Sequence, residues 1–177
     1  MDKLLSVLVR YRVLGAFVLS VVFFVLARPE GWSVALGLLL SLAGAALRTW
    51  ASGHIEKGRS LATAGPYSLV RNPLYLGSFI MGAGVCVMGR HPLMSAVFLV
   101  LFPVVYLRKI GDEERHLLQK FGREFEEYQA GTPRIIPGTL RPAPGGTFDW
   151  ELVIRHREYQ VWLGLAAVTA LMALKTL

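Results

Sequence analysis

Apolar residues form five long runs along the chain, and none of these runs contains a charged side chain. They lie at residues 13–27, 32–47, 74–88, 92–107 and 161–174. Each run is shorter than the roughly 20 residues needed to cross a hydrocarbon core, but interfacial aromatic residues flank most of them, and flanking arginines such as Arg48 can snorkel. The pattern therefore predicts an all-α, polytopic membrane bundle of about five transmembrane helices.

The connections between these runs are of two kinds. Residues 28–31 join the first run to the second, and residues 89–91 join the third to the fourth, so each pair is expected to form an antiparallel hairpin. Pro103 lies within the fourth run and is expected to bend its helix. The other two connections, 48–73 and 108–160, are long and polar, and any chemistry must be assembled from them.

Basic residues set the expected orientation. The chain has 19 Lys and Arg against 12 Asp and Glu, a formal net charge of +7. An N-terminus in the cytoplasm places 16 of the 19 basic residues on the inner side, which is the positive-inside pattern. The basic excess is then typical of cytoplasmic loops, so no nucleic-acid partner is expected. The sequence predicts an integral membrane protein whose N-terminus and active site are cytoplasmic.

Composition restricts the other classes of site. The single cysteine, Cys86, excludes an intramolecular disulfide and a cysteine-based zinc cluster, and the four histidines lack metal-type spacing. No metal site is therefore predicted. Arg28 and Pro29 follow the first apolar run directly, without a small-residue cleavage site, so no cleavable signal peptide is predicted.

The first polar connection ends in a helix-start pattern. Asn72 followed by Pro73 predicts an N-cap and the first helical position of the third membrane helix. The positive end of that helix, beside Arg71, suits a carboxylate or a phosphate. Arg71 could equally be a positive-inside anchor, and Gly65 with Pro66 a plain turn.

The second polar connection contains a helical repeat of apolar residues from 113 to 128, which predicts an amphipathic helix on the bundle or in the interface. Glu114 falls in the middle of its apolar face, where an unpaired carboxylate is costly. A ligand, Arg71 or Arg134 could be its partner. Alternatively, Glu114 is only an acidic residue in the first turn of the helix, where the helix dipole stabilises it. This alternative is stronger for Glu113, which lies to the side of the apolar face.

The rest of this connection is less specific. Residues 133–137 form a stiff apolar strap that suits closure over a ligand, although a plain loop fits the composition equally well, and residues 141–146 are typical of a linker. A helix from Glu151 is expected to run into the fifth membrane segment. Arg155 and Glu158 on it could pair with each other at i, i+3 spacing.

Taken together, these residues resemble the isoprenylcysteine carboxyl methyltransferase family, part of a wider group of integral-membrane methyltransferases that includes phospholipid N-methyltransferases. The match covers residues 50–137, about half of the chain. Asn72 replaces the histidine usual in the family, which keeps a hydrogen-bonding group and removes a titratable one. The residues that carry the resemblance are Gly65-Pro66-Tyr67, Val70-Arg71-Asn72-Pro73, Tyr75, Gly77, Glu113-Glu114, Leu117, Phe121-Gly122, Phe125, Tyr128, Pro133-Arg134 and Pro137.

The resemblance implies a pocket for S-adenosylmethionine that opens to the cytoplasm, within a single domain over residues 1–177. The N-terminal hairpin would occupy 1–48, the cofactor-binding core 49–137, and the linker with the C-terminal helix 138–177. The residues expected to be catalytic are Arg71, Glu114, Arg155 and Glu158. The residues expected to bind the cofactor are Gly65, Pro66, Tyr67, Arg71, Asn72, Pro73, Tyr75, Gly77, Glu113, Glu114 and Arg134.

In this interpretation Arg71 holds the methionine carboxylate, Glu114 accepts from the amino group or the ribose, and Tyr67 or Tyr75 packs on the adenine or near the sulfonium. A carboxylate acceptor would need no general base, whereas an amine would have to lose a proton. The lipophilic or prenylated substrate is expected to enter sideways from the bilayer, with the helix from Glu151 on one side of the entrance.

The preferred function is therefore carboxylate O-methylation of a lipophilic substrate by an S-adenosylmethionine-dependent membrane enzyme. Phospholipid or amine N-methylation is the alternative within the same class. A membrane reductase of the sterol type would instead bind a nicotinamide cofactor. A non-enzymatic scaffold or transporter subunit would use the cytoplasmic cluster only as surface charge.

Overall fold

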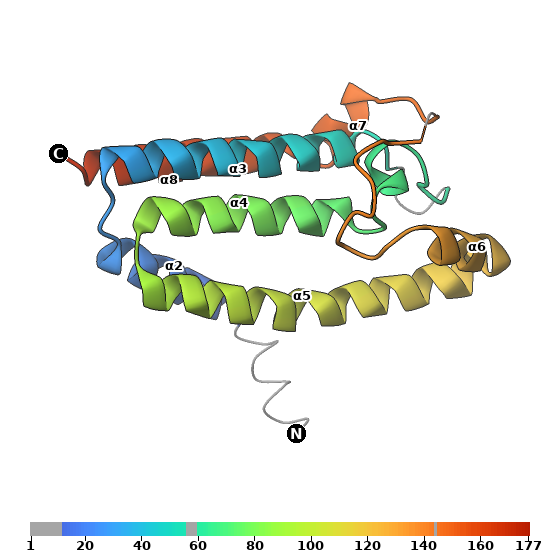
Figure 1. Ribbon diagram of the computed structural model, residues 1–177, viewed down its shortest axis with the longest axis horizontal. Helices are drawn as coiled ribbons and strands as arrows, with labels where there is room; N and C mark the ends of the chain where they lie inside the picture. The colour runs from blue at the N-terminus through green and yellow to red at the C-terminus, as the bar shows by residue number, and fades with distance from the viewer. Residues whose placement is uncertain (1–11, 56–59, 144) are drawn as a thin grey trace, which may run out of the picture.

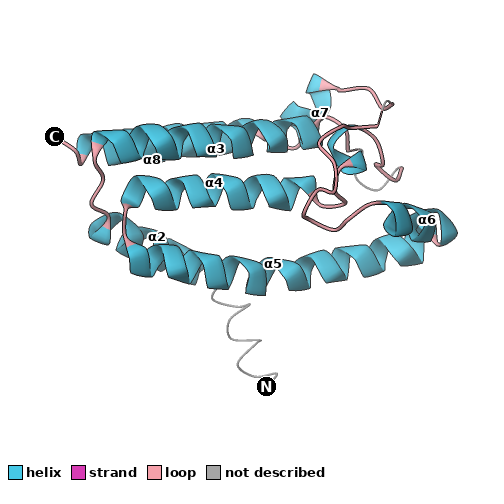
Figure 2. Cartoon of the chain, viewed as in Figure 1, coloured by secondary structure: helices cyan, strands magenta, loops and turns pink. Residues whose placement is uncertain are grey.

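All regular structure in the described part of the chain is helical. The computed structural model describes residues 12–55, 60–143 and 145–177 (Figure 1), and no strand occurs in these ranges (Figure 2). The all-α prediction is confirmed there. The elements are α2 (Arg12–Leu26), α3 (Gly31–Ser52), the 3-10 turn η1 (Gly65–Ser68), α4 (Pro73–Gly89), α5 (Pro92–Phe121), α6 (Arg123–Gly131), α7 (Trp150–Arg155) and α8 (Tyr159–Leu174).

The long helices run side by side along one axis. Figure 1 shows α3, α4 and α5 next to one another, with α8 along α3. The predicted α4–α5 hairpin is confirmed, and the chain also reverses direction between α2 and α3. The short turns and the C-terminus lie at one end of the bundle, and both long polar connections lie at the other. The two segments singled out for chemistry therefore meet at the same end.

Two helices, Gly31–Ser52 and Pro92–Phe121, are long and apolar enough to cross a membrane. Three more, Phe17–Leu26, Pro73–Gly89 and Tyr159–Leu174, are apolar but shorter. Many large apolar side chains of α2, α3, α5 and α8 point outward and are exposed, as expected where a helix faces lipid. Five crossings and the cytoplasmic orientation stay predictions, and the basic residues at 1–11 and 56–59 that support the orientation lie outside the described residues.

Helices α3 and α4 form the closest pair because small residues line their contact. A Cβ atom at Gly37 would lie 2.4 Å from the carbonyl oxygen of Gly84, and one at Gly44 would lie 2.5 Å from that of Gly77. The Ser41 hydroxyl donates to a backbone carbonyl of α4 at 3.0 Å. Such close backbone approach is the usual way in which membrane helices associate. This pair fixes the start of α4, where the site lies.

The amphipathic helix predicted over residues 113–128 has different bounds in the structure. The fourth apolar run continues without a break into the polar segment, so α5 has 30 residues and ends at Phe121. Gly122 then takes a φ of 53°, which a glycine adopts without strain, and α6 begins at Arg123. Pro103 lies inside α5, which curves along its length in Figure 1.

The continuous helix predicted from Glu151 is also wrong. Helix α7 ends at Arg155, and α8 begins only at Tyr159. Between them Arg157 has a φ of 57°, in the left-handed region, so the chain turns sharply. This turn directs Glu158 back toward α3.

Candidate functional site

A cavity of about 880 Å³ opens at the polar end of the bundle. The ends of α3 and η1, the start of α4, the polar half of α5 and the turn before α8 all contribute to its wall. Eight of the predicted site residues line it: Tyr67, Arg71, Asn72, Pro73, Tyr75, Glu113, Glu114 and Glu158.

Glu114 lies at the centre of one polar cluster. Its Oε1 accepts from Arg71 Nε at 3.0 Å and from Asn72 Nδ2 at 3.2 Å, and its Oε2 accepts from Arg134 Nη2 at 2.6 Å. The Glu114 side chain is only 8% exposed and that of Arg71 9%. Of the alternative partners expected for this carboxylate, the structure brings both Arg71 and Arg134 to it, and the carboxylate is fixed by three donors.

Arg71 also holds the chain that follows α6. Its Nη1 donates to the carbonyl oxygens of Gln129 at 2.8 Å and Thr132 at 3.0 Å, and its backbone N–H donates to that of Pro133 at 2.8 Å. The guanidinium is therefore oriented by Glu114 on one edge and by two carbonyls on another. Its Nη2 makes no hydrogen bond within the described residues, and Arg71 is one of the residues that line the cavity, so this nitrogen is the one left to bind an anionic group.

Asn72 has the predicted position but not the predicted capping contact. Helix α4 begins at Pro73, yet the Asn72 side chain makes no cap hydrogen bond. Its amide donates instead to Glu114 and, at 3.2 Å, to the carbonyl oxygen of Arg134. A capping contact would need the side-chain oxygen to accept from the first turn of α4, whereas here the side-chain nitrogen donates to the two oxygens, so Asn72 joins α4 to α5 and to the 133–137 strap.

A second acidic group faces the cavity from α5. The Tyr75 hydroxyl donates to Glu113 Oε1 at 2.7 Å, and Lys109 Nζ lies 5.8 Å from the centre of the Tyr75 ring. Tyr106 packs on Tyr75 with 5.4 Å between the ring centres. Aromatic faces, a carboxylate and an ammonium group thus lie together on the α4–α5 side.

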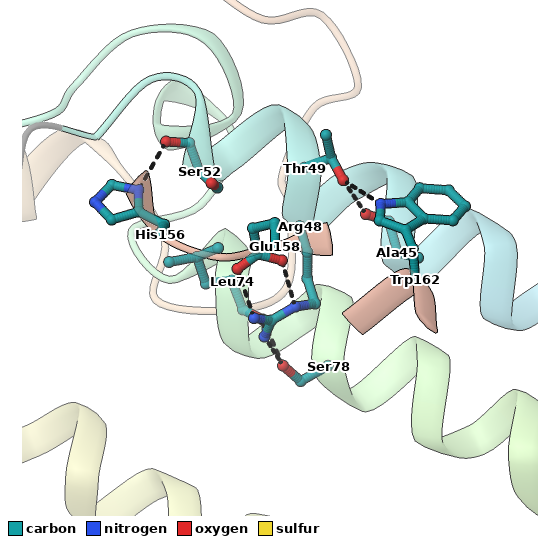
Figure 3. Close-up of polar contacts among 9 residues, drawn as sticks. All are labelled: Ala45, Arg48, Thr49, Ser52, Leu74, Ser78, His156, Glu158 and Trp162. Atoms are coloured by element: carbon teal, nitrogen blue, oxygen red, sulfur yellow. Dashed lines mark hydrogen bonds and ion pairs between the residues drawn. The ribbon is translucent and has the colours of Figure 1, made fainter. Parts of the chain in front are cut away.

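Arg48 and Glu158 form a separate ion pair on the α3–α8 side (Figure 3). Arg48 Nη2 donates to Glu158 Oε1 at 2.8 Å and its Nε donates to Oε2 at 3.2 Å, while Nη1 donates to the Ser78 hydroxyl. The Glu158 side chain is 7% exposed. The sequence interpretation treated Arg48 only as a snorkelling anchor. Its place at the end of an otherwise uncharged run was the available indication that it needed a buried partner.

Two buried hydroxyl groups in the cavity wall have no hydrogen-bond partner in the described residues, those of Ser52 and Tyr67. Burial raises the pKa of the Tyr67 phenol far above its usual value, and the electrostatic effect of Tyr128 adds to the shift. The phenol therefore stays protonated at physiological pH.

The other five predicted site residues do not line the cavity. Arg155 pairs with Glu151 at 2.9 Å with its side chain 56% exposed, so the suggested Arg155–Glu158 pair is wrong. Arg134 is half-exposed and pairs with Glu114 at 2.6 Å. Gly65 has a φ of 58° with the His54 ring against it, and Gly77 packs against α3. Pro66 is buried in η1.

Within residues 12–55, 60–143 and 145–177, no group of three or more His, Cys, Asp or Glu side chains is placed to hold a metal ion.

Comparison with known proteins places this geometry in a family. The phospholipid methyltransferase family matches residues 32–124, from the start of α3 to the first residues of α6. The cobalt-zinc-cadmium resistance protein CzcN of Cupriavidus metallidurans is 35% identical over 168 residues, which cover 89% of this chain and 77% of that protein. Protein-S-isoprenylcysteine O-methyltransferase B of Arabidopsis thaliana is 30% identical over 135 residues, 68% of each chain.

The matched segment contains both halves of the Arg71–Glu114 pair, and it also contains Arg48, Asn72 and Glu113. The resemblance in the sequence motifs and the family match therefore overlap over residues 50–124, which include Arg71, Asn72, Glu113 and Glu114. The chain belongs to the phospholipid methyltransferase family, in the group of membrane methyltransferases that includes the isoprenylcysteine O-methyltransferases.

Proposed function

We propose that the chain is a methyltransferase that uses S-adenosylmethionine from the aqueous phase and methylates a lipophilic acceptor from the membrane. The observation that carries this proposal is the cavity at the polar end of an apolar helix bundle, where Arg71, held by Glu114 and by two backbone carbonyls, is one of the lining residues. Water-borne and lipid-borne molecules can both reach such a position.

The residues of the cavity suit the charges of the cofactor. Arg71 Nη2 can bind the methionine carboxylate, and Glu113 can accept from the methionine ammonium group. Tyr75 and Tyr106 present aromatic faces suited to adenine or to the sulfonium. Glu114, with three donors of its own, orients Arg71, so we assign it a positioning role. When bound, the cofactor supplies an activated methyl group.

The acceptor most compatible with the cavity is a carboxylate. Such an acceptor is already anionic at neutral pH and needs no general base. The two buried carboxylates are poorly suited to be bases, because Glu114 is paired with two arginines and Glu158 with one. N-methylation of a lipid amine is the second candidate, because the matched family takes its description from phospholipid methylation.

Cofactor class can be tested by calorimetric titration of the detergent-purified protein with S-adenosylhomocysteine and, separately, with NADPH. We expect one molecule of S-adenosylhomocysteine to bind per chain and NADPH not to bind. Binding of NADPH alone would indicate a reductase, and binding of neither would indicate a scaffold.

Acceptor chemistry can be tested with methyl-labelled cofactor and two probes, an S-farnesyl thioether acid and a phosphatidylethanolamine vesicle. We expect label on the acid, released as methanol by mild base because the product is an ester. Base-stable label on the lipid amine would support the second candidate instead.

Orientation can be tested with single cysteines in a Cys86→Ala background. A cysteine at Thr63 or Gln119 should react with a membrane-impermeant maleimide only after the membrane is opened, whereas one at Arg28 should react in intact cells. Reaction of Thr63 and Gln119 from opposite sides would rule out both the topology and a site shared between the two polar connections.

A further inference from the structure

The outer face of the short helix α7 is divided into an apolar edge and a charged edge. Trp150 and Ile154, four residues apart, are each 65% exposed. Glu151 and Arg155, also four residues apart, form an exposed ion pair at 2.9 Å on the neighbouring edge. Leu152 faces inward and is buried. Helices that lie in a membrane interface divide their side chains in this way, with one edge toward lipid and the other toward water.

The level of α7 along the bundle coincides with the edge of a hydrocarbon core. Helix α3 is long and apolar enough to cross a membrane, and Trp32 is exposed near its start, as expected of an interfacial aromatic residue. Ser52, at the other end of α3, follows 20 residues later, about 30 Å along a straight helix, which is the thickness of a typical core. At this end the Asp149 N–H donates to the carbonyl oxygen of Gly53 at 2.9 Å, and His156 Nδ1 lies 3.2 Å from that of Ser52. The segment that contains α7 is therefore attached where hydrocarbon gives way to headgroups.

Helix α7 also lies to the side of the bundle rather than over its end. Figure 1 shows it beside the last part of α3, on the side away from α4. A segment that is displaced sideways from membrane-crossing helices lies above the surrounding lipid. The exposed apolar side chains continue along the chain into α8, where Tyr159 and Leu163 point outward. The apolar edge of α7 is thus followed directly by a helix face suited to lipid.

Contacts with the end of α3 hold the Trp150 ring in its outward position. The ring packs edge-on against Phe148, with 4.9 Å between the ring centres. The Phe148 ring in turn lies against Gly53, where a Cβ atom would be 2.4 Å from it. A large aromatic ring held out into water is unfavourable, whereas a membrane interface accommodates both the apolar body of an indole and its polar N–H.

We propose that the apolar edge of α7, formed by Trp150 and Ile154, is a membrane-surface anchor that inserts among the headgroups and upper acyl chains of the lipid around α3 and α8. The charged edge of the helix stays in water. The same segment then enters the cavity, because His156 and Glu158 line its wall. The lipid surface thereby helps to fix one wall of the cavity. This anchor is independent of the proposed methyltransferase function.

Nitroxide labels on single cysteines test the anchor in phosphatidylcholine vesicles, with Ile154→Cys and Glu151→Cys each made in the Cys86→Ala background. Both positions are exposed, so neither label should disturb the packing of α7. Power-saturation measurements compare collisions with oxygen, which concentrates in lipid, and with a water-soluble nickel chelate. We expect the Ile154 label to be at least about twofold more accessible to oxygen than to the chelate. The Glu151 label, on the charged edge of the same helix, is the matched control and should show the reverse preference.

Equal access of the nickel chelate to both labels would place both edges in water and overturn the anchor. Shielding of the Ile154 label from both reagents would also overturn it, because protein would then cover this edge, and dipolar broadening of the spectrum would identify the cover as a second copy of the chain. Failure of the same protein to bind S-adenosylhomocysteine would refute the proposed function and leave the anchor standing.

Discussion

Replacing Glu114 by alanine is expected to destabilise the fold by about 3 kcal/mol or more, because removing one partner of a buried ion pair leaves an uncompensated charge. It is also expected to weaken S-adenosylhomocysteine binding at least about tenfold, or about 1.4 kcal/mol, because Arg71 is no longer oriented. The loss would leave the Arg71 guanidinium, which is 9% exposed, without its carboxylate and free to turn from the cavity. The same change should lower the thermal midpoint, since Asn72 and Arg134 lose their common acceptor. Titration calorimetry and thermal unfolding in detergent measure the two effects.

Glu127→Ala provides the control for charge removal on the same side of the protein. Glu127 pairs with Arg123 on α6, and both side chains are largely exposed. Exposed ion pairs contribute little to stability, so the affinity for S-adenosylhomocysteine and the thermal midpoint should both stay close to the wild-type values. If Glu114→Ala bound S-adenosylhomocysteine within twofold of the wild type, the Glu114 cluster would only stabilise the fold, and the cofactor would bind elsewhere.

Replacing Gly84 by leucine is expected to prevent correct assembly of the bundle, with little monodisperse protein recovered. A Cβ at this position would lie 2.5 Å from the carbonyl oxygen of Gly37 and 2.6 Å from the backbone nitrogen of Ser41. Neither backbone atom can move aside without separating α3 from α4. Size-exclusion chromatography of a fluorescent fusion, before and after heating, measures the folded fraction.

Gly164→Leu is the matched substitution on α8, where a Cβ would meet no atom within 4 Å. It should give a normal monodisperse yield. Equal yields from the two variants would mean that the helices tolerate a larger spacing than the structure shows.

The Glu114 cluster is the part of the site that sequence reasoning predicted best. The helical period predicts this carboxylate on an apolar face, where its cost calls for a cationic or hydrogen-bonding partner, with a ligand, Arg71 and Arg134 as the alternatives. The structure contains both pairs. This prediction was possible because the helical period alone shows that Glu114 lies on an apolar face, and a carboxylate buried there without a partner is unfavourable. The functional role assigned to the cluster stays a prediction.

The Arg48–Glu158 pair could not be derived in the same way. Its members are 110 residues apart, and their contact depends on the left-handed turn at Arg157. A glycine usually indicates such a turn in a sequence, and here the position is an arginine. The sequence favoured a continuous helix there, with Arg155 as the nearby partner for Glu158. Tertiary contact with α3 outweighed the local helical preference. Tertiary contacts also explain why the Asn72 side chain does not cap α4 as local rules predict, since its amide donates to Glu114 and to the carbonyl of Arg134.

Because α5 is continuous from its apolar part to the cavity, the position of the cavity relative to the membrane surface depends on the thickness of the bilayer. The apolar part of α5 ends at Leu107, 15 residues or about 23 Å after Pro92, and the acidic pair follows about 9 Å further along the same helix, beyond Arg108 and Lys109. A thicker membrane would draw Glu113 and Glu114 toward hydrocarbon, and a thinner one would lift the cavity away from lipid-borne molecules. Turnover of a lipophilic acceptor is therefore expected to depend on the acyl chain length of the surrounding lipid, with binding of a water-soluble cofactor depending on it far less.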